Sequence, residues 1–433
     1  MALSTQPYKG ARDFYPEDKR VQKYMFSTLR TAAERFGYEE YDAPILEPLD
    51  IYLAKSGEEI VNEQTYMFED RGGRKVVIRP EMTPTVSRMV AAKRQELAYP
   101  LRWYSIPNLW RYERPQRGRL REHWQLNVDV FGIASTAAEL EMITLVNSIF
   151  TAFGAQPSMY EIRINHRGLI DYLLADYLQL GTDTQHAVGK MIDRINKMDR
   201  AEFIGKVDAA LADADRESGV TEKLLAILDA KTLQELPVEA KTQPSYAETQ
   251  TLLDQLGAAG VSNVRFDPTI MRGFDYYTGI IFEVADTDAE NNRSMMGGGR
   301  YDGLVGLFGV APVPTVGFGW GDVTLENFLR SHRLMPELPS ETDLYIALVS
   351  DLNAQVQPAL AELRATGLNV AVDVSGRKLG DQFKAAEKKG IANVLIIGET
   401  ELESGQFKLK NLVSGLEQVS SISDIAKTLH DRH

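Results

Sequence analysis

Five arginines stand close together in the segment RYERPQRGRLRE, in a pattern that suits an anionic ligand. Guanidinium groups repel one another unless an anion lies between them, and the planar fork of arginine matches the geometry of phosphate. The alternative is a solvated hairpin whose charges protect a sheet edge, which is a common arrangement. The residue types alone leave both interpretations open for Arg111, Arg114, Arg117, Arg119 and Arg121.

Three polar residues follow the arginines at a spacing of two. Gln125, Asn127 and Asp129 alternate with apolar residues, so their side chains point to one face of a predicted strand. The surrounding stretch, Leu101–Gly132, has two strand-like runs separated by a loop that contains Pro115 and Gly118. The pattern therefore predicts a hairpin that carries a phosphate site and continues into a polar pocket.

The segment RPEMT, Arg79–Thr83, places a carboxylate and a hydroxyl immediately before a predicted helix. Glu81 could bind an ammonium group there, with Thr83 as a second acceptor. Both residue types are also common at helix starts, where they cap backbone N–H groups. From the sequence alone, helix capping is the favoured interpretation.

Two glycine-containing segments could approach a ligand closely. In MRGFDYYTGIIFEV, Arg272 precedes the pair Tyr276 and Tyr277 at the start of a predicted strand. In SMMGGGRYDG, three glycines that end at Gly299 would let the backbone pass close to a flat ligand such as a purine. The second segment is neither a Walker loop nor GxGxxG, and tight strand connections are a sufficient alternative explanation.

Composition limits the class of protein. A chain of 433 residues is expected to form two or three domains, and its net charge of −13 excludes nucleic-acid binding by bulk charge. Cysteine is absent and the six histidines are scattered, so no metal site built from protein side chains is predicted. No apolar run reaches transmembrane length and no signal-peptide core is apparent, so we expect no membrane association and a cytoplasmic location.

The predicted elements divide the chain into successive parts. Residues 1–164 alternate between helix and strand patterns, residues 165–261 are dominated by helical spacing, and strand signals return in residues 262–333. Helical spacing predicts helices at about residues 17–36, 137–153 and 323–332. The pattern also predicts a strand at residues 38–46 that Pro44 interrupts, and a hairpin across the turn at residues 70–73. Pro336 and Pro339 mark a linker at residues 334–340. Apolar strands alternate with helices in residues 341–433, which predicts a separate α/β domain with partly parallel strands.

Taken together and in order, several segments resemble the histidyl-tRNA synthetases, a family of class II aminoacyl-tRNA synthetases. The segments are KGARDFYP, RFGYEEYDAPILE, RPEMT, RYERPQRGRLRE, RGFDYYTG, GGGRYDGLVGLFG and VPTVGFGWG. GRKLGDQFKAAEKKGIANVLIIGE is similar to the family's anticodon-binding domain. The resemblance implies an α+β fold, with an antiparallel sheet flanked by helices, a helical insertion and a C-terminal α/β domain. It also implies a homodimer formed through the first motif, around Pro44.

The resemblance assigns roles around the amino acid and the nucleotide. Glu81 and Thr83 would bind the α-ammonium of L-histidine, Gln125 would lie near its backbone, and Asp129 and Tyr277 would bind the imidazole nitrogens. The implied histidine-binding set is Glu81, Thr83, Arg111, Gln125, Asp129, Arg272, Tyr276 and Tyr277. The implied ATP-binding set is Arg111, Glu113, Arg119, Arg121 and Gly299. Arg111 and Arg272 would be catalytic at the α-phosphate, and Mg²⁺ would bridge the distal phosphates.

The resemblance also implies contacts with tRNA(His), for which the candidate residues are Arg114, Arg117, Lys378 and Lys384. The enzyme would activate L-histidine with ATP to histidyl-adenylate and pyrophosphate, then transfer histidine to the 3′ end of tRNA(His). One position departs from the family pattern. Thr324 stands where the third motif, Gly-x-Gly-x-x-Arg, has its arginine, which leaves the distal phosphates one charge short.

The alternative is a non-catalytic relative, the synthetase-like regulatory subunit of ATP phosphoribosyltransferase. Thr324 favours this alternative, whereas the arginine hairpin, Arg272 and the C-terminal domain favour the ligase. The sequence therefore predicts a working enzyme.

Overall fold

The computed structural model describes residues 3–53, 64–116, 118–195, 198–271, 276–291 and 294–430. The chain forms two compact units. The first contains the segment up to Tyr15 and Val21–Met335, and the second contains Pro16–Arg20 and the chain from Pro336 onward.

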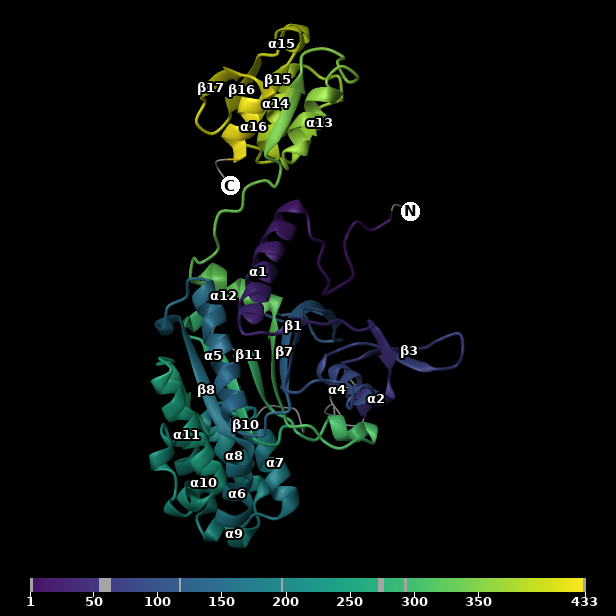
Figure 1. The fold of residues 1–433 in the computed structure, drawn as a ribbon. Coiled ribbons are helices and arrows are strands. Elements are labelled where there is room, and N and C mark those ends of the chain that lie inside the picture. Colours follow the sequence, from purple (N-terminus) through teal and green to yellow (C-terminus); the bar gives the residue numbers. More distant parts are fainter. Residues whose placement is uncertain are drawn as a thin grey trace. The chain divides into compact units, whose positions relative to one another are not determined.

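A nine-stranded sheet organises the first unit, in the order β1-β5-β7-β12-β11-β10-β8-β9, with β6 paired to β7 (Figure 1). Neighbouring strands are antiparallel from β5 to β8, and the outer pairs β1–β5 and β8–β9 are parallel. The predicted antiparallel sheet is confirmed. The strands are β1 Glu39–Glu40, β5 Leu101–Ser105, β6 Asn108–Trp110, β7 Glu122–Phe131, β8 Tyr160–His166, β9 Val264–Phe266, β10 Ile280–Asp286, β11 Ser294–Arg300 and β12 Thr315–Gly321.

Helices cover the sheet with apolar faces. The buried residues of α1, Pro16–Arg35, include Met25, Leu29 and Ala32, at helical spacing. Helices α5, Ala137–Ala152, and α12, Asp322–Ser331, contribute to the same core. Sequence periodicity located all three helices, because burial on one face imposes the 3.6-residue repeat that it detects.

A smaller antiparallel sheet, β2-β4-β3, lies beside the large one. Its strands are β2 Leu46–Pro48, β3 Tyr66–Glu69 and β4 Lys75–Ile78. The predicted hairpin across residues 70–73 is confirmed, and Gly73 N donates to Asp70 O over 2.9 Å. The strand pattern predicted for residues 38–46 is interrupted at Pro44 as expected, and β1 and β2 on either side of it join different sheets. Helix α2, Asp50–Leu53, and helix α4, Thr83–Ala92, follow β2 and β4.

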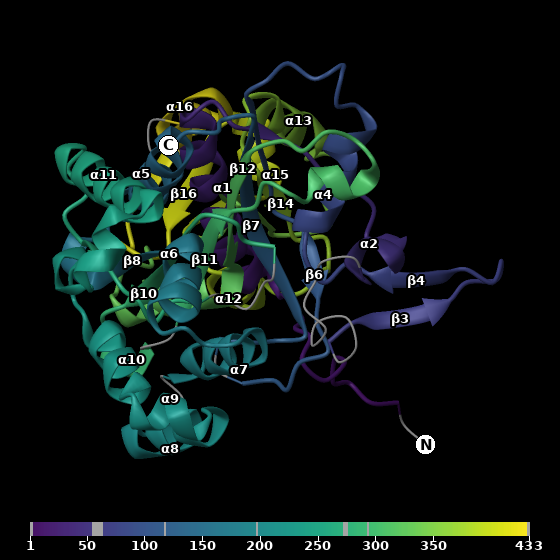
Figure 2. The same ribbon diagram turned by 90° about the horizontal axis from the view of Figure 1, so that it is seen from below.

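The predicted helical region follows β8 and forms its own apolar cluster. Leu252 and Leu256 of its last helix pack in the core of the large sheet, which ties the two cores together. Figures 1 and 2 place these helices and the β3–β4 hairpin at opposite edges of the sheet. The helices are α6 Arg167–Tyr172, η2 Leu173–Tyr177, α7 Thr182–Ile192, α8 Arg200–Ala210, α9 Asp213–Glu217, α10 Val220–Asp229, η4 Leu233–Glu235, η5 Val238–Thr242 and α11 Pro244–Ala258.

The second unit is built on a five-stranded sheet of order β14-β13-β15-β16-β17. Strand β13 pairs in parallel with β14 and β15, which confirms the predicted partly parallel α/β fold. The elements are β13 Leu344–Leu348, α13 Gln357–Ala365, β14 Val370–Val372, α14 Leu379–Lys388, β15 Asn393–Ile397, α15 Glu399–Ser404, β16 Phe407–Asn411, β17 Glu417–Ser420 and α16 Ile422–His430. Within the described ranges, no helix is both long and apolar enough to cross a membrane.

Candidate functional site

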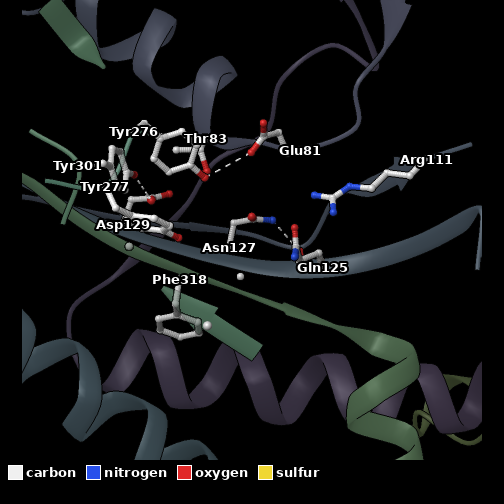
Figure 3. A pocket seen from close by; sticks show the side chains of 13 residues that line it. Glu81, Thr83, Arg111, Gln125, Asn127, Asp129, Tyr276, Tyr277, Tyr301 and Phe318 are labelled. Carbon is white, nitrogen blue, oxygen red and sulfur yellow. Dashed lines mark hydrogen bonds between the residues drawn. The ribbon is translucent and has the colours of Figure 1, made fainter. Parts of the chain in front are cut away.

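A polar pocket lies over β7, β11 and β12 in the first unit (Figure 3). It encloses about 430 Å³, part of it open to solvent. Seven of the residues predicted to bind the amino acid line it: Glu81, Thr83, Arg111, Gln125, Asp129, Tyr276 and Tyr277. The structure therefore brings together residues that are separated in the sequence by up to almost two hundred positions. The remaining lining residues are Asn127, Gly297, Tyr301, Gly317, Phe318 and Gly319.

The floor of the pocket follows from the register between β7 and β12. Asp129 pairs with Gly317, Asn127 with Gly319 and Gln125 with Gly321. A Cβ on Gly317 would lie 2.0 Å from Asp129 Oδ1, and one on Gly319 would lie 2.7 Å from Gln125 Nε2. The polar side chains of β7 therefore occupy the space above β12 that the side chains of any other residue type would fill.

The glycines of β11 extend the same floor. Gly297 pairs with Gly319, and Gly299 pairs with Gly317. A Cβ on Gly299 would lie 2.9 Å from Cδ1 of Tyr277, so this glycine makes room for a ring that lines the pocket. Glycines on two adjacent strands thus give the ligand a flat surface to approach.

One end of the pocket is acidic and buried. Asp129 is 4% exposed, and its Oδ1 accepts a hydrogen bond from the Tyr301 hydroxyl. Burial raises the pKa of the Asp129 carboxyl to about 7, although the Tyr301 hydrogen bond acts to lower it. The ring of Tyr276 lies 4.9 Å from that of Tyr277 and 5.6 Å from that of Tyr301, centroid to centroid. An acceptor in a wall of aromatic rings suits a flat ligand that carries an N–H group.

Glu81 and Thr83 lie on the wall formed by the start of α4. Glu81 is 3% exposed, and its carboxylate accepts from the Tyr276 hydroxyl over 3.4 Å. The backbone carbonyl of Glu81 accepts from the Tyr52 hydroxyl over 3.3 Å. The capping interpretation of RPEMT is wrong, because Met82 is the N-cap and makes no side-chain capping bond. The polar side chains of Glu81 and Thr83 line the pocket instead.

The other end of the pocket is basic. Arg111 follows β6, and its Nε donates to Pro80 O over 2.9 Å, which fixes the guanidinium beside the chain that enters α4. Figure 3 shows this side chain near Gln125, at the end away from Asp129. The pocket therefore offers a carboxylate at one end and a guanidinium at the other.

The other arginines of the hairpin have separate partners. Arg121 stacks on Tyr112, with Cζ 4.0 Å from the ring centroid, and its Nη1 donates to the Tyr8 hydroxyl over 3.1 Å. Arg119 lies 3.5 Å from the carboxylate of Glu113, another residue of the implied ATP-binding set. Arg114 is exposed, and Arg117 lies outside the described residues. Among the hairpin arginines in the described ranges, only Arg111 lines the pocket.

The predicted catalytic Arg272 also lies outside the described residues. The chain leading to it is anchored by Asn165, whose side-chain amide donates to Ile270 O over 2.9 Å. The chain leading away from it begins with Tyr276, which lines the pocket.

Thr324 adds no charge to the site. Its hydroxyl donates to Met295 O over 2.8 Å and to Gly321 O over 3.0 Å. The tip of the arginine hairpin lies beside it, since a Cβ on Gly118 would be 3.6 Å from Thr324 Cγ2.

Sequence reasoning placed Asn127 on the pocket face but gave it no ligand, and it did not assign Tyr301 or the glycines of β12 to the pocket. The signal for the glycines was present in TVGFGWG, where glycine alternates with Val316, Phe318 and Trp320, which are buried in the core. The signal for Tyr301 was weaker, because nothing in GGGRYDG indicates which residue its hydroxyl reaches. Across the described ranges, no three His, Asp or Glu side chains converge as metal ligands.

The sequence matches two family models, histidyl-tRNA synthetase over residues 10–321 and anticodon binding domain over residues 343–432. The histidine–tRNA ligase of Leptospira biflexa is 44% identical over 431 residues, which cover 99% of this chain and 98% of that protein. The histidine–tRNA ligase of Haloarcula marismortui is 38% identical over 418 residues, which cover 95% and 94%.

Two solved structures share the fold. The histidyl-tRNA synthetase of Nostoc sp. PCC 7120 has a TM-score of 0.82 at 23% identity and covers 100% of both chains. A Bacillus halodurans protein described as an ATP phosphoribosyltransferase regulatory subunit/histidyl-tRNA synthetase has a TM-score of 0.74 at 22% identity, with 92% of this chain and 99% of that chain covered.

The buried carboxyl of Asp129 predicts a pH-dependent loss of stability. Its pKa is raised to about 7 in the folded chain, so the folded state holds this proton more tightly than the unfolded state does. Stability should therefore fall as the pH rises from about 4 toward 7. Asp129→Asn removes the titration, and we expect the variant to be more stable than the parent at pH 8 by on the order of 2 kcal/mol, with little difference at pH 4.

Urea unfolding of both proteins from pH 4 to pH 8 measures this difference. Asp176→Asn, which changes an exposed carboxylate, is the matched control and should leave the pH profile unchanged. A constant difference between Asp129→Asn and the parent across the pH range would contradict the assignment.

Proposed function

The chain belongs to the histidyl-tRNA synthetase family, and from that premise we propose how its pocket binds histidine and ATP. The protein is a histidine–tRNA ligase, an ATP-dependent enzyme. The observation that carries the proposal is the pairing of Gln125, Asn127 and Asp129 with glycines, between an acidic wall and Arg111.

Histidine would lie along this row with its imidazole at the buried end. Asp129 and Tyr277 would bind the ring nitrogens, and Tyr276 would close the pocket against the ring. A buried acceptor that is matched to an N–H group rejects ligands lacking it, because the acceptor would otherwise remain unpaired. The α-ammonium would meet Glu81 and Thr83, and the carboxylate would point toward Gln125 and Arg111.

The carboxylate of histidine would then face the α-phosphate of ATP beside Arg111. In the adenylation step, a carboxylate oxygen forms a bond to the α-phosphorus, and the bond from that phosphorus to the bridging oxygen breaks to release pyrophosphate. No protein nucleophile is needed, so the residues act by positioning and by stabilising charge. We assign this role to Arg111 and Arg272, although Arg272 lies outside the described residues.

The remaining nucleotide contacts would come from the hairpin and β11, namely Glu113, Arg119, Arg121 and Gly299. ATP would enter as its magnesium complex. With no cluster of three acidic or histidine ligands in the described ranges, the phosphate oxygens of ATP would provide most of the magnesium coordination.

Two copies of the chain would associate through the region of β2, β3 and α2. Large apolar side chains there are 45–53% exposed, which is unusual for a surface that remains in water. They are Ile45, Leu46, Leu53, Met67 and Phe68. We propose that this surface is the homodimer interface, and that the enzyme works in the cytoplasm, where tRNA is charged for translation.

The second unit would bind the anticodon of tRNA(His). Lys378 precedes α14, and Lys384 on that helix has a side chain that is 81% exposed. Arg114, which is exposed in the hairpin, and Arg117 would meet the acceptor end of the tRNA. Local positive charges of this kind are required because the chain as a whole is acidic.

The activity is tested by exchange of labelled pyrophosphate into ATP. The purified protein should catalyse exchange with histidine and with none of the other common amino acids. Glu81→Gln should lower the exchange rate by raising KM for histidine, since it removes the charge that binds the α-ammonium. Histidine binding without any exchange would favour the regulatory-subunit alternative.

The tRNA contacts are tested by removing two positive charges together. Lys378→Ala with Lys384→Ala should raise KM for tRNA(His) in the charging reaction by about tenfold, as expected when two phosphate contacts are lost. Pyrophosphate exchange should stay unchanged, because both lysines lie outside the first unit. Lys427→Ala, on α16, is the control; charging kinetics equal to the parent's in the double variant would contradict the assignment.

A further inference from the structure

The segment before α1 lies along the base of the arginine hairpin. The carbonyl of Gly10 accepts from Arg121 N over 2.9 Å and from Glu122 N over 3.1 Å. Phe14 packs edge-on against Trp124, with 5.2 Å between the ring centroids. These contacts hold the intervening Arg12 next to the start of β7.

Arg12 reaches the first turn of α12. Its Nη2 donates to Asp322 Oδ2 over 2.6 Å, and Asp322 is 3% exposed. The other oxygen of Asp322 accepts from Trp124 N over 3.0 Å, so the carboxylate is fixed by β7 as well. The guanidinium carbon of Arg12 also lies 4.9 Å from the centre of the Phe14 ring. The Arg12 guanidinium is therefore held in a defined place.

Part of that guanidinium has no partner. Arg12 Nε is buried and has no hydrogen-bond acceptor among the described residues. Leaving such a donor unpaired is destabilising, and more so for a charged group, so an unpaired buried donor in a folded protein needs an explanation. The side chain as a whole is 23% exposed, which leaves it accessible to a ligand.

His123 lies close enough to Arg12 and to Arg111 to be affected by both charges. It lies on β7 two residues before Gln125, so its side chain is on the pocket face of the strand. Its pKa is lowered to about 3 by burial and by the positive charges of Arg111 and Arg12. The polar side chains of β7 on the pocket face thus continue beyond Gln125 to the neutral imidazole of His123. The guanidinium groups of Arg12 and Arg111 lie near this imidazole.

The surrounding groups leave room for negative charge there. Asp322 is the acidic partner of Arg12, whereas Arg111 donates to a backbone carbonyl and has no carboxylate partner among the described residues. Thr324, on the same turn of α12 as Asp322, contributes only a hydroxyl that is bonded to backbone carbonyls. The hairpin lies beside this turn at Gly118.

We propose that Arg12 binds the β- and γ-phosphates of ATP, with Asp322 as the residue that positions it. This inference rests on the proposed function of the pocket. It assumes that the α-phosphate lies at Arg111 and that the distal phosphates continue from there, away from Asp129. A phosphate oxygen would be the acceptor that the buried Nε of Arg12 lacks. The positive charge of Arg12 would replace that of the arginine for which Thr324 stands.

The test compares Arg12→Gln and Arg12→Lys with the parent in calorimetric titrations of ATP, AMP and adenosine. Arg12→Gln can still donate to Asp322 but has no charge. We expect its affinity for ATP to fall by about tenfold or more, as for the loss of a charge-assisted hydrogen bond, with AMP and adenosine bound nearly as before. Arg12→Lys should recover part of the loss. Arg30→Ala, which breaks an exposed ion pair of 3.1 Å with Glu40, is the control.

Exchange kinetics separate substrate contact from a structural role. Arg12→Gln should raise KM for ATP and leave KM for histidine within about twofold of the parent's. An equal rise in both values, or an equal loss of adenosine binding, would overturn the phosphate assignment. A parent protein that binds ATP but shows no exchange would instead count against the proposed function, and the binding titrations would still decide the role of Arg12.

A second measurement uses the parent protein alone and does not depend on a folded variant. Phenylglyoxal modifies accessible guanidinium groups, and mass spectrometry locates the modified residue. Pyrophosphate and ATP should protect Arg12, and adenosine should not. Equal modification of Arg12 with and without pyrophosphate would overturn the proposal.

Discussion

The pairing register between β7 and β12 is the constraint on which the site depends. Side chains alternate across a strand, so a shift of one residue would turn Gln125, Asn127 and Asp129 toward the core and expose Leu126, Val128 and Val130. The apolar face therefore fixes the register, and the register places each polar residue opposite a glycine. The same cross-strand pairing buries the apolar side chains in the core on one face and leaves space for the pocket on the other.

The polarity of the pocket has an energetic cost. A carboxyl buried beneath tyrosines is destabilising when ionised, yet an acceptor at that place is what a buried N–H group requires. Arg111 at the opposite end is fixed by a backbone carbonyl, so its charge remains available to an anion. Stability is thus exchanged for a site whose two ends favour opposite charges, which orients any ligand that carries both.

Much of the fold and of the amino-acid pocket could be predicted from the sequence. Helical periodicity located α1, α5 and α12, and the residues expected around histidine line one pocket wherever the structure describes them. Contacts between distant segments could not be predicted. The sequence did not show that Arg121 stacks on Tyr112 or that Arg119 lies near Glu113. Helix capping was inferred for Glu81 because local spacing does not show a pocket that is assembled from β7, β11 and β12.

The central claim is that the missing side chain at Gly317 makes the space in which Asp129 binds the imidazole. Calorimetric titration of histidine into Gly317→Ala tests it most directly, with Gly303→Ala as the control because a Cβ there meets nothing within 4 Å. The added methyl group would stand 2.0 Å from Asp129 Oδ1, so the carboxylate must move. We expect histidine affinity to fall by about a hundredfold, as when a buried polar contact is lost, while ATP still binds. Histidine affinity equal to that of Gly303→Ala would contradict the account.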